Sequence, residues 1–384
     1  MNAIALPLVT GIVVIVLACI AFMSFTRRAA RRIEQAVPMD GRHIDIEGER
    51  IHYAEYGNGG GDGPPIVFVH GLCGQMRNFA YLPLEALARK HRVILIDRPG
   101  SGYSTRGAHT PANIRTQANT VARLVAALGL EAPVLVGHSL GGAIALAVAL
   151  DHPESVARLA LIAPLTHVQT DVPKAFRALV VRSARVRRFM ARTLATPFGL
   201  ATSTPTLKAV FAPEAVPADF RTRGGALLSV RPQGFYNASM DLVAIEDSDD
   251  LEQMERRYAN LTVPVDVLFG RDDIVLDWMR HGDALRRRSK RVTLKLIHGG
   301  HMLPVTAPAT TCDWLLASIA GTTMQANGEA PIAVDRHDGA QSPAAAAPLR
   351  SHAATQASRQ MGYSTGMQTN PVRCDGKIEK QRSA

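Results

Sequence analysis

Short apolar runs alternate with helix-like stretches along most of this 384-residue chain, and this alternation limits the possible folds more than any other feature. Continuous apolar runs of a few residues are typical of strands that are buried on both faces. Strands that alternate with helices predict an α/β fold, in which a mainly parallel sheet carries helices on both faces. The runs occupy residues 66–69, 93–96, 134–136, 159–162, 265–269 and 292–297, and the helical stretches occupy residues 82–89, 114–128, 140–150, 278–288 and 309–319.

The remaining regions are a hairpin, an insertion and a tail. Residues 42–48 and 50–56 alternate in hydropathy around a turn, which predicts an opening hairpin for a core domain over residues 40–320. At about residues 165–260 the alternation stops, and arginine-rich helical sequence with proline and glycine breaks indicates an inserted helical cap. Residues 321–384 have little apolar periodicity, so we expect a disordered tail, with a regulatory interaction segment as the alternative.

The N-terminal segment carries no charged residue from position 3 to position 25. A helix over this segment spans about 34 Å, which is enough to cross a bilayer. A cleaved signal peptide is the alternative, but neither Met1 nor Asn2 is basic and the apolar run is longer than such a peptide needs. We therefore predict that residues 1–32 form a single-pass transmembrane anchor with a basic flank.

The distribution of charge and cysteine bears on location and partners. Arginines follow the apolar segment at positions 27, 28, 31 and 32, and basic flanks favour the cytoplasmic side, so we expect the body of the chain there. The net charge of +10 comes without any nucleic-acid-binding pattern, and we predict no nucleic-acid partner. The cysteines show no paired spacing, which predicts neither a disulfide framework nor a metal site.

The sequence Gly-His-Ser-Leu-Gly at residues 137–141 directly follows an apolar strand and opens a helix rich in small residues. A serine at such a strand-to-helix turn is held in a strained conformation, and the flanking glycines prevent clashes as the chain turns back. The pentapeptide alone is weak evidence, but its position between strand and helix is specific. Ser139 is therefore the predicted nucleophile.

A serine hydroxyl needs a histidine base and a carboxylate that orients the histidine, and at this type of turn they follow in the order serine, acid, histidine. The strand at 265–269 is followed by Asp272 and Asp273, and the last strand is followed by His298 and His301. The carboxyl ends of parallel strands meet at the edge where such sites assemble. We predict His301 as the base and interpret His298 as structural, while both aspartates are candidates for the acid.

These motifs together resemble the α/β-hydrolase superfamily over about residues 40–320. The resemblance implies Ser139 as nucleophile, His301 as base, and Asp273, the third residue after the strand-ending glycine, as orienting acid. It also implies an oxyanion hole formed by the backbone N–H groups of Leu72 and Leu140, with no cofactor and no metal. The motifs are His70-Gly71, Asp97-Arg98-Pro99-Gly100-Ser101-Gly102-Tyr103-Ser104, Gly137-His138-Ser139-Leu140-Gly141-Gly142, Gly270-Arg271-Asp272-Asp273 and Gly300-His301.

The reaction implied by the resemblance is hydrolysis of a carboxylic ester, or a related acyl bond, of a small molecule through an acyl-enzyme. Ser139 argues against haloalkane dehalogenases and epoxide hydrolases, which carry an aspartate at the same position. The carbon-carbon bond hydrolases are not favoured, because their oxyanion loop is usually richer in glycine than residues 70–74. A non-catalytic ligand-binding protein and an acyltransferase are the alternatives.

The predicted cap contains an amphipathic basic helix, in which arginines recur opposite apolar residues. Its charged face is either solvated or rests on anionic lipid headgroups. We expect its apolar positions to line a pocket for a lipid-derived acyl chain. The arginines are Arg177, Arg182, Arg185, Arg188 and Arg192, and the apolar residues opposite them are Phe176, Val180, Val186, Phe189 and Met190. The cap positions expected to line the pocket are Phe176, Leu179, Val180, Phe189 and Met190.

Overall fold

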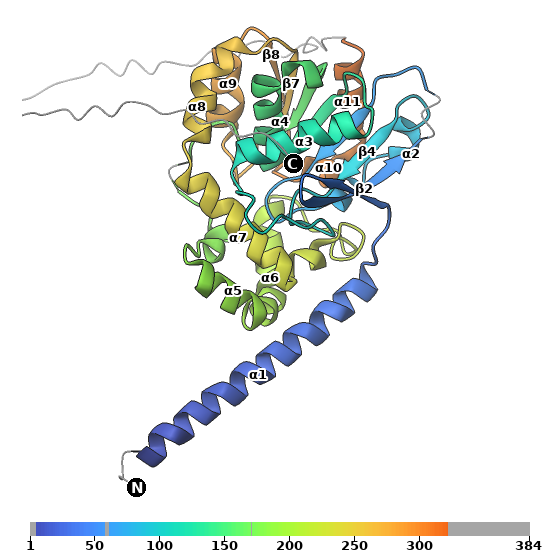
Figure 1. Cartoon of the computed structure of the whole chain (residues 1–384). Coiled ribbons are helices and arrows are strands. Elements are labelled where there is room, and N and C mark those ends of the chain that lie inside the picture. Colours follow the sequence, from blue (N-terminus) through green and yellow to red (C-terminus); the bar gives the residue numbers. More distant parts are fainter. Residues whose placement is uncertain (1–4, 58–60, 170, 322–384) are drawn as a thin grey trace, which may run out of the picture. The chain divides into compact units, whose positions relative to one another are not determined.

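The computed structural model describes residues 5–57, 61–169 and 171–321, so the predicted tail lies outside the described residues except for Gly321. Within these ranges, eight strands form one sheet in the order β1-β2-β4-β3-β5-β6-β7-β8 (Figure 1). The β1/β2 and β2/β4 pairs are antiparallel and the other pairs are parallel, as expected from the alternation. The strands are β1 (Arg42–Ile46), β2 (Glu49–Tyr56), β3 (Ile66–Val69), β4 (Val93–Ile96), β5 (Val134–His138), β6 (Arg158–Ile162), β7 (Val265–Gly270) and β8 (Val292–Ile297).

The continuous apolar runs are explained by burial on both faces of the sheet. In β3, Val67 and Val69 pack with residues of α3 (Ile114–Ala127) and α4 (Leu140–Asp151). Ile66 and Phe68, which point to the opposite face, pack with residues of α2 (Leu84–Leu87) and α11 (Pro308–Ile319). Because side chains alternate along a strand, every residue of a run must be apolar when both faces are covered.

Two of the predicted helices differ in extent from the sequence pattern. The stretch at 82–89 contains only the short helix α2. The stretch at 278–288 begins as the π-helix η6 (Met279–Asp283) and continues as α9 (Ala284–Arg288). The π-type turn brings His281 inward, where it is fully buried and accepts the backbone N–H of Thr166.

The insertion between β6 and β7 is mainly helical. It contains η3 (Lys174–Leu179), α5 (Ala184–Arg192), α6 (Ala195–Phe211), η4 (Ala226–Val230), α7 (Pro232–Asp247) and α8 (Asp250–Arg257). The predicted basic amphipathic helix is therefore two separate elements, η3 and α5, because the chain leaves the helical conformation between Val180 and Ser183. Arg187 in α5 is buried and donates to the Ser239 hydroxyl, whereas Phe189 is exposed.

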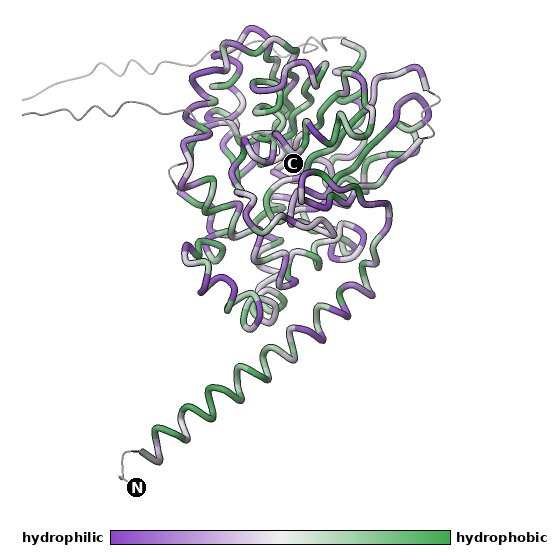
Figure 2. The backbone as a smooth tube through the Cα atoms, viewed as in Figure 1, coloured by the Kyte–Doolittle hydropathy of each residue, from purple (hydrophilic) through white to green (hydrophobic). Residues whose placement is uncertain are grey.

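The helix α1 (Ala5–Ala36) extends well beyond the apolar segment that predicted it. Its apolar part is long and hydrophobic enough to cross a membrane, by length and composition alone (Figure 2). Its C-terminal part packs on the cap, where Ile33, together with Val37 just after the helix, clusters with Leu228 of η4. Glu34 forms an ion pair with Arg231 at 2.8 Å. The apolar segment thus continues without a break into a helix that belongs to the packed domain.

Candidate active site

Ser139 lies at the sharp turn between β5 and α4 with φ 55° and ψ −120°. Residues other than glycine rarely adopt this conformation. The turn is so tight that a Cβ atom at Gly141 would lie 2.0 Å from the Val69 carbonyl oxygen. A Cβ atom at Gly71 would lie 2.9 Å from the Ser139 Cβ. Glycine at both positions therefore allows the loop after β3 to approach the serine closely.

The acid and the histidine meet at the carboxyl edge of the sheet. The Asp273 carboxylate lies 2.8 Å from His301 Nδ1, and both side chains are buried. The other Asp273 oxygen accepts backbone N–H groups from Val275 and Leu276 at 2.8 and 3.0 Å. Burial alone would raise the pKa of Asp273, but His301 and the two N–H donors outweigh burial and hold it below its usual value. The carboxylate is therefore ionised and fixed against the imidazole.

Of the two candidate aspartates, the structure brings Asp273 to His301. Asp272 is half exposed and accepts the backbone N–H of Gly299 at 3.1 Å. The histidine that pairs with Asp272 is His298, whose Nδ1 lies 3.8 Å from the carboxylate and whose ring is almost fully exposed. Consecutive residues after a strand point in different directions, and only the second of these two points inward.

Two further histidines are fixed as neutral rings. Burial, reinforced by His301, lowers the pKa of His138 to about 3, and its Nε2 lies 3.0 Å from the His301 carbonyl oxygen. Burial, reinforced by Arg98, likewise lowers the pKa of His70 to about 3. His70 Nδ1 donates to the Gly71 carbonyl while Nε2 accepts the Arg98 N–H, so the ring braces the loop after β3. The Cys73 thiol in the same loop has its pKa raised to about 12 by burial, which leaves it protonated.

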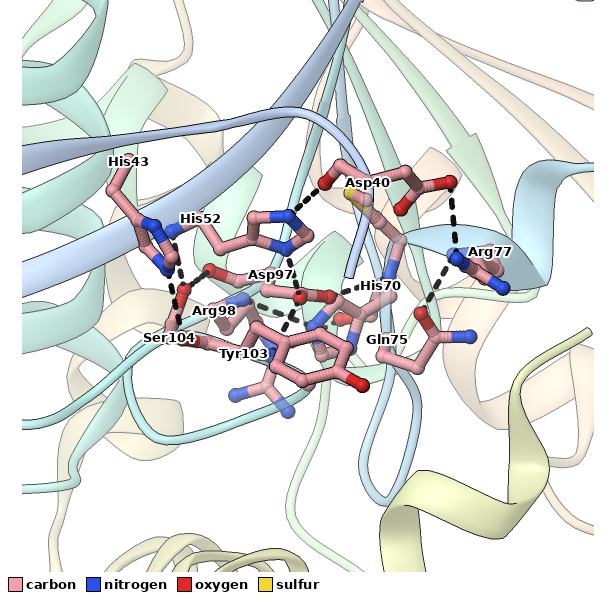
Figure 3. Close-up of polar contacts among 12 residues, drawn as sticks. Asp40, His43, His52, His70, Gln75, Arg77, Asp97, Arg98, Tyr103 and Ser104 are labelled. Atoms are coloured by element: carbon pink, nitrogen blue, oxygen red, sulfur yellow. Dashed lines mark hydrogen bonds and ion pairs between the residues drawn. The ribbon is translucent and has the colours of Figure 1, made fainter. Parts of the chain in front are cut away.

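Arg98 lies next to the loop after β3, residues 70–75, and stabilises it (Figure 3). Its side chain is fully buried. The guanidinium donates to the carbonyl oxygens of His70 and Gly71, each at 2.9 Å. It also donates to Asp241 in α7 of the cap at 2.9 Å and to Gln117 at 2.6 Å. The positions of these carbonyls fix the direction of the neighbouring N–H groups, including that of Leu72.

A second buried histidine–aspartate pair lies beside this loop. Asp97 forms an ion pair with His52 at 2.7 Å and accepts the N–H groups of Met76 and Tyr103 at 2.8 and 2.9 Å (Figure 3). The other ring nitrogen of His52 contacts the carbonyl oxygen of Asp40. Burial alone would lower the pKa of His52, but Asp97 and Asp40 outweigh burial and raise it. This pair anchors the turn at 97–104.

The five predicted site residues come together around two cavities. Ser139, Leu72 and His301 line a cavity of about 590 Å³, whose wall is largely apolar and includes cap residues. Ser139, Leu72 and Leu140 line a second cavity of about 380 Å³ on the side of α7 and α8. Asp273 supports the site through His301. Of the cap positions predicted to line a pocket, Phe176, Leu179 and Met190 line the larger cavity, whereas Val180 and Phe189 are exposed on the surface.

The cap also holds the site through residues that the sequence pattern did not indicate. Both carboxylate oxygens of Glu214 accept the N–H of Gly300, at 3.0 and 3.1 Å, next to His301. Ser229 donates to the Cys73 carbonyl, and Gln75 donates to the Gly224 carbonyl at 2.7 Å. These contacts join residues far apart in sequence, so no local signal marks them.

Comparison with known proteins identifies the class. Residues 64–308 match the family model described as alpha/beta hydrolase fold, which is more than half of the chain. With the sheet order, the serine turn and the buried acid–histidine pair, this match defines an enzyme of the hydrolase class. The chain belongs to the α/β-hydrolase-fold family.

Individual relatives share parts of the chain. It is 37% identical over 122 residues to the dihydrolipoyllysine-residue acetyltransferase component of the acetoin cleaving system of Cupriavidus necator, a match that covers 32% of this chain and 31% of that protein. It thus spans about a third of that relative. It is 37% identical over 130 residues to 2-hydroxymuconate semialdehyde hydrolase of Pseudomonas sp. strain CF600, which covers 33% of this chain and 44% of the relative.

A solved structure matches over a larger share of the chain. The crystal structure described as a membrane phospholipase A aligns with a TM-score of 0.58 and 22% identity, over 84% of this chain and 98% of that chain. Similarity at this level of identity shows the shared fold alone.

Proposed function

We propose that this chain is a membrane-anchored serine hydrolase that cleaves carboxylic esters with an apolar acyl group through a Ser139-His301-Asp273 triad. The observation that carries the proposal is the placement of Ser139 and His301 in the wall of one largely apolar cavity. The Asp273 carboxylate is paired with Nδ1 of the same imidazole. A strained serine, a histidine and an ionised carboxylate in this relation are the parts of an acyl-transfer site.

In this mechanism, the Ser139 hydroxyl attacks the ester carbonyl carbon while His301 accepts its proton. The N–H groups of Leu72 and Leu140 stabilise the negative oxygen of the tetrahedral intermediate. The C–O bond to the alcohol then breaks, and His301 returns the proton to the leaving oxygen. Water, deprotonated by His301, hydrolyses the acyl-enzyme and restores Ser139. Asp273 holds the imidazole in the required tautomer throughout.

The two cavities suit the two halves of an ester. Both are lined by Ser139 and Leu72, so a carbonyl group placed at the serine borders both cavities. The larger cavity is lined mainly by apolar side chains and is assigned to the acyl chain. The smaller one includes Gln169, Glu246 and Glu252, and is assigned to the alcohol. Lipid-derived esters have this division into an apolar and a polar half.

The substrate proposal is tested with a series of p-nitrophenyl esters from acetyl to medium chain. We expect kcat/KM to rise threefold or more per two carbons until the cavity is filled, from about 0.8 kcal/mol of apolar transfer energy per CH₂. A flat or falling profile contradicts the acyl assignment. Labelling by a fluorophosphonate in the wild type, and its loss in Ser139→Ala, separates an enzyme from a ligand-binding protein.

The location of the chain is proposed as single-pass in a membrane, with the catalytic domain on the cytoplasmic side. Retention of the N-terminal segment is supported by Thr26, Ala29 and Ile33, which are buried just after the apolar part of the same helix. The cytoplasmic side is supported by the arginine flank. We expect the full chain to stay with membranes through a carbonate wash. Protease added to intact cells should leave the domain intact, and its digestion from outside contradicts the orientation.

A further inference from the structure

The outer face of α5 is an exposed basic and apolar surface. Arg185, Arg188 and Arg192 are exposed on it together with Val186 and Phe189, the latter 52% exposed. The neighbouring Arg182 pairs with Glu246 and Asp247, but no ion pair of the described residues includes Arg185, Arg188 or Arg192. A surface of this kind combines uncompensated positive charge with large apolar side chains.

This surface lies where the apolar segment of α1 ends. The Thr26 hydroxyl donates to the Thr193 carbonyl at 2.8 Å, and both residues are buried. Thr193 directly follows Arg192, and Thr26 directly precedes Arg27 in the flank of the apolar segment. The C-terminal end of α5 is therefore fixed to α1 at the level where that helix leaves a bilayer.

We infer that the outer face of α5 docks on the anionic surface of the membrane that α1 spans. Here Val186 and Phe189 enter the headgroup region and the three arginines bind lipid phosphates. The inference rests on the proposed anchoring by α1, because the Thr26 contact holds this face at the interface only when the apolar segment is in the bilayer. The membrane is favoured as the occupant over another protein because the surface is continuous with the arginine flank of the span.

Docking also places the larger cavity at the leaflet. Met190 and Leu194, which lie beside Thr193 in sequence, line that cavity, and so does Phe198 of α6. Phe198 is at the same time 62% exposed, so the cavity wall reaches the surface at this corner of the cap. A lipid ester can then enter the cavity from the membrane without crossing water.

The first test measures depth in the bilayer directly. Phe189→Trp and, as a matched control, Leu316→Trp on the exposed side of α11 are introduced into the full chain. Each is reconstituted in nanodiscs of phosphatidylcholine and phosphatidylglycerol with brominated acyl chains. We expect bromine to quench the tryptophan at 189 well beyond the wild-type background and to leave that at 316 at background. Equal quenching at the two positions overturns the inference, and this includes the case in which α5 binds a second copy of the chain.

The second test separates docking from chemistry. The variant Arg185→Glu/Arg188→Glu/Arg192→Glu is compared with Arg288→Glu/Lys290→Glu/Arg291→Glu, a trio of exposed basic residues directly before the edge strand β8, outside the cap. For an ester embedded in anionic vesicles we expect the first variant to lose about tenfold or more in kcat/KM and the second to lose little. Hydrolysis of soluble p-nitrophenyl butyrate should not change in either.

The outcomes distinguish this inference from the proposed function. Equal losses in the two trios, or an equal loss on the soluble ester, overturn docking by α5. Failure of the wild-type chain to hydrolyse any ester overturns the proposed function instead, and the quenching measurement then still decides whether α5 meets the bilayer.

Discussion

Two histidine–aspartate pairs have nearly the same nitrogen–oxygen distance, one beside Ser139 and one beside the loop after β3. His301 and Asp273 are 2.8 Å apart, and His52 and Asp97 are 2.7 Å apart. His301 forms part of the wall of the cavity that contains Ser139. His52 is fully buried, and its second nitrogen is occupied by the Asp40 carbonyl. The same pair of side chains is therefore available to substrate in one place and enclosed in the other.

The difference lies in what the second ring nitrogen meets. In His52 both ring nitrogens face acceptors, the Asp97 carboxylate and the Asp40 carbonyl oxygen, and these contacts outweigh burial and raise the pKa of the ring. In His301, the hydrogen bond found among the described residues is made by Nδ1, to the Asp273 carboxylate, and the ring borders the cavity that contains Ser139. A histidine acts as a base only when one nitrogen is free to accept a proton, so the short distance to an aspartate does not by itself indicate catalysis.

The largest expected effect is loss of the nucleophile or base. We expect Ser139→Ala and His301→Ala each to lower kcat for ester hydrolysis by up to about 10⁶, with the double variant no worse than either, because the two act as one unit. His52, the enclosed histidine, serves as the comparison. The His52→Ala variant should lose activity only in proportion to the fraction of protein molecules that are unfolded. Steady-state kinetics on p-nitrophenyl esters measures both. Retention of more than about a tenth of wild-type activity by Ser139→Ala would remove Ser139 as the nucleophile.

A smaller loss is expected at the acid. Asp273→Asn should lower kcat by about 10³ to 10⁴, because the amide no longer holds the imidazole in the needed tautomer. Asp272→Asn is the matched control one residue away and should be mild, since Asp272 accepts only the Gly299 N–H. The reverse order of the two variants in the same assay would assign the acid to Asp272.

The smallest effect on kcat, but a clear effect on the free energy of unfolding, is expected at the enclosed His52–Asp97 pair. Asp97→Asn removes the charge that compensates His52 and should lower the free energy of unfolding by about 3 to 5 kcal/mol, as for other buried pairs that lose one partner. Thermal unfolding in detergent measures the loss, and exposed Asp62→Asn is the control. A wild-type-like unfolding curve for Asp97→Asn would show that the pair does not anchor the turn.

The contribution of this pair should also depend on pH. The pKa of Asp97 is lowered because His52 and the backbone donors outweigh burial, so its stabilisation is lost as the pH falls through that lowered value. The pKa of His52 is raised, so its stabilisation is complete below about 6.5 and is lost as the pH rises through the raised value. The stability difference between wild type and Asp97→Asn should therefore be largest between about pH 4 and 6.5. A difference that is constant across pH 3 to 9 contradicts this account.

Much of the fold was predictable because its signals are local. The apolar runs, the small-residue helix after Ser139 and the turn between residues 42–48 and 50–56 each depend on neighbours within a few residues. The described structure has the strands and the serine turn at those positions. The sequence pattern also placed an acid and His301 after the correct strands. It did not separate Asp272 from Asp273 without the resemblance, because both follow the same strand.

What the sequence determined by itself is the order of strands and helices, the serine turn and the apolar segment of α1, since periodicity and backbone conformation are properties of short stretches. Only the tertiary structure decided that α1 continues to Ala36, that Val180 and Phe189 face outward, and that Glu214 and Arg98 brace the catalytic loops. It alone also enclosed His52 while leaving His301 at the cavity. These outcomes depend on contacts between residues tens to hundreds of positions apart, such as Arg98 with Asp241, and a pattern within one stretch of sequence carries no information about which distant side chain will meet it.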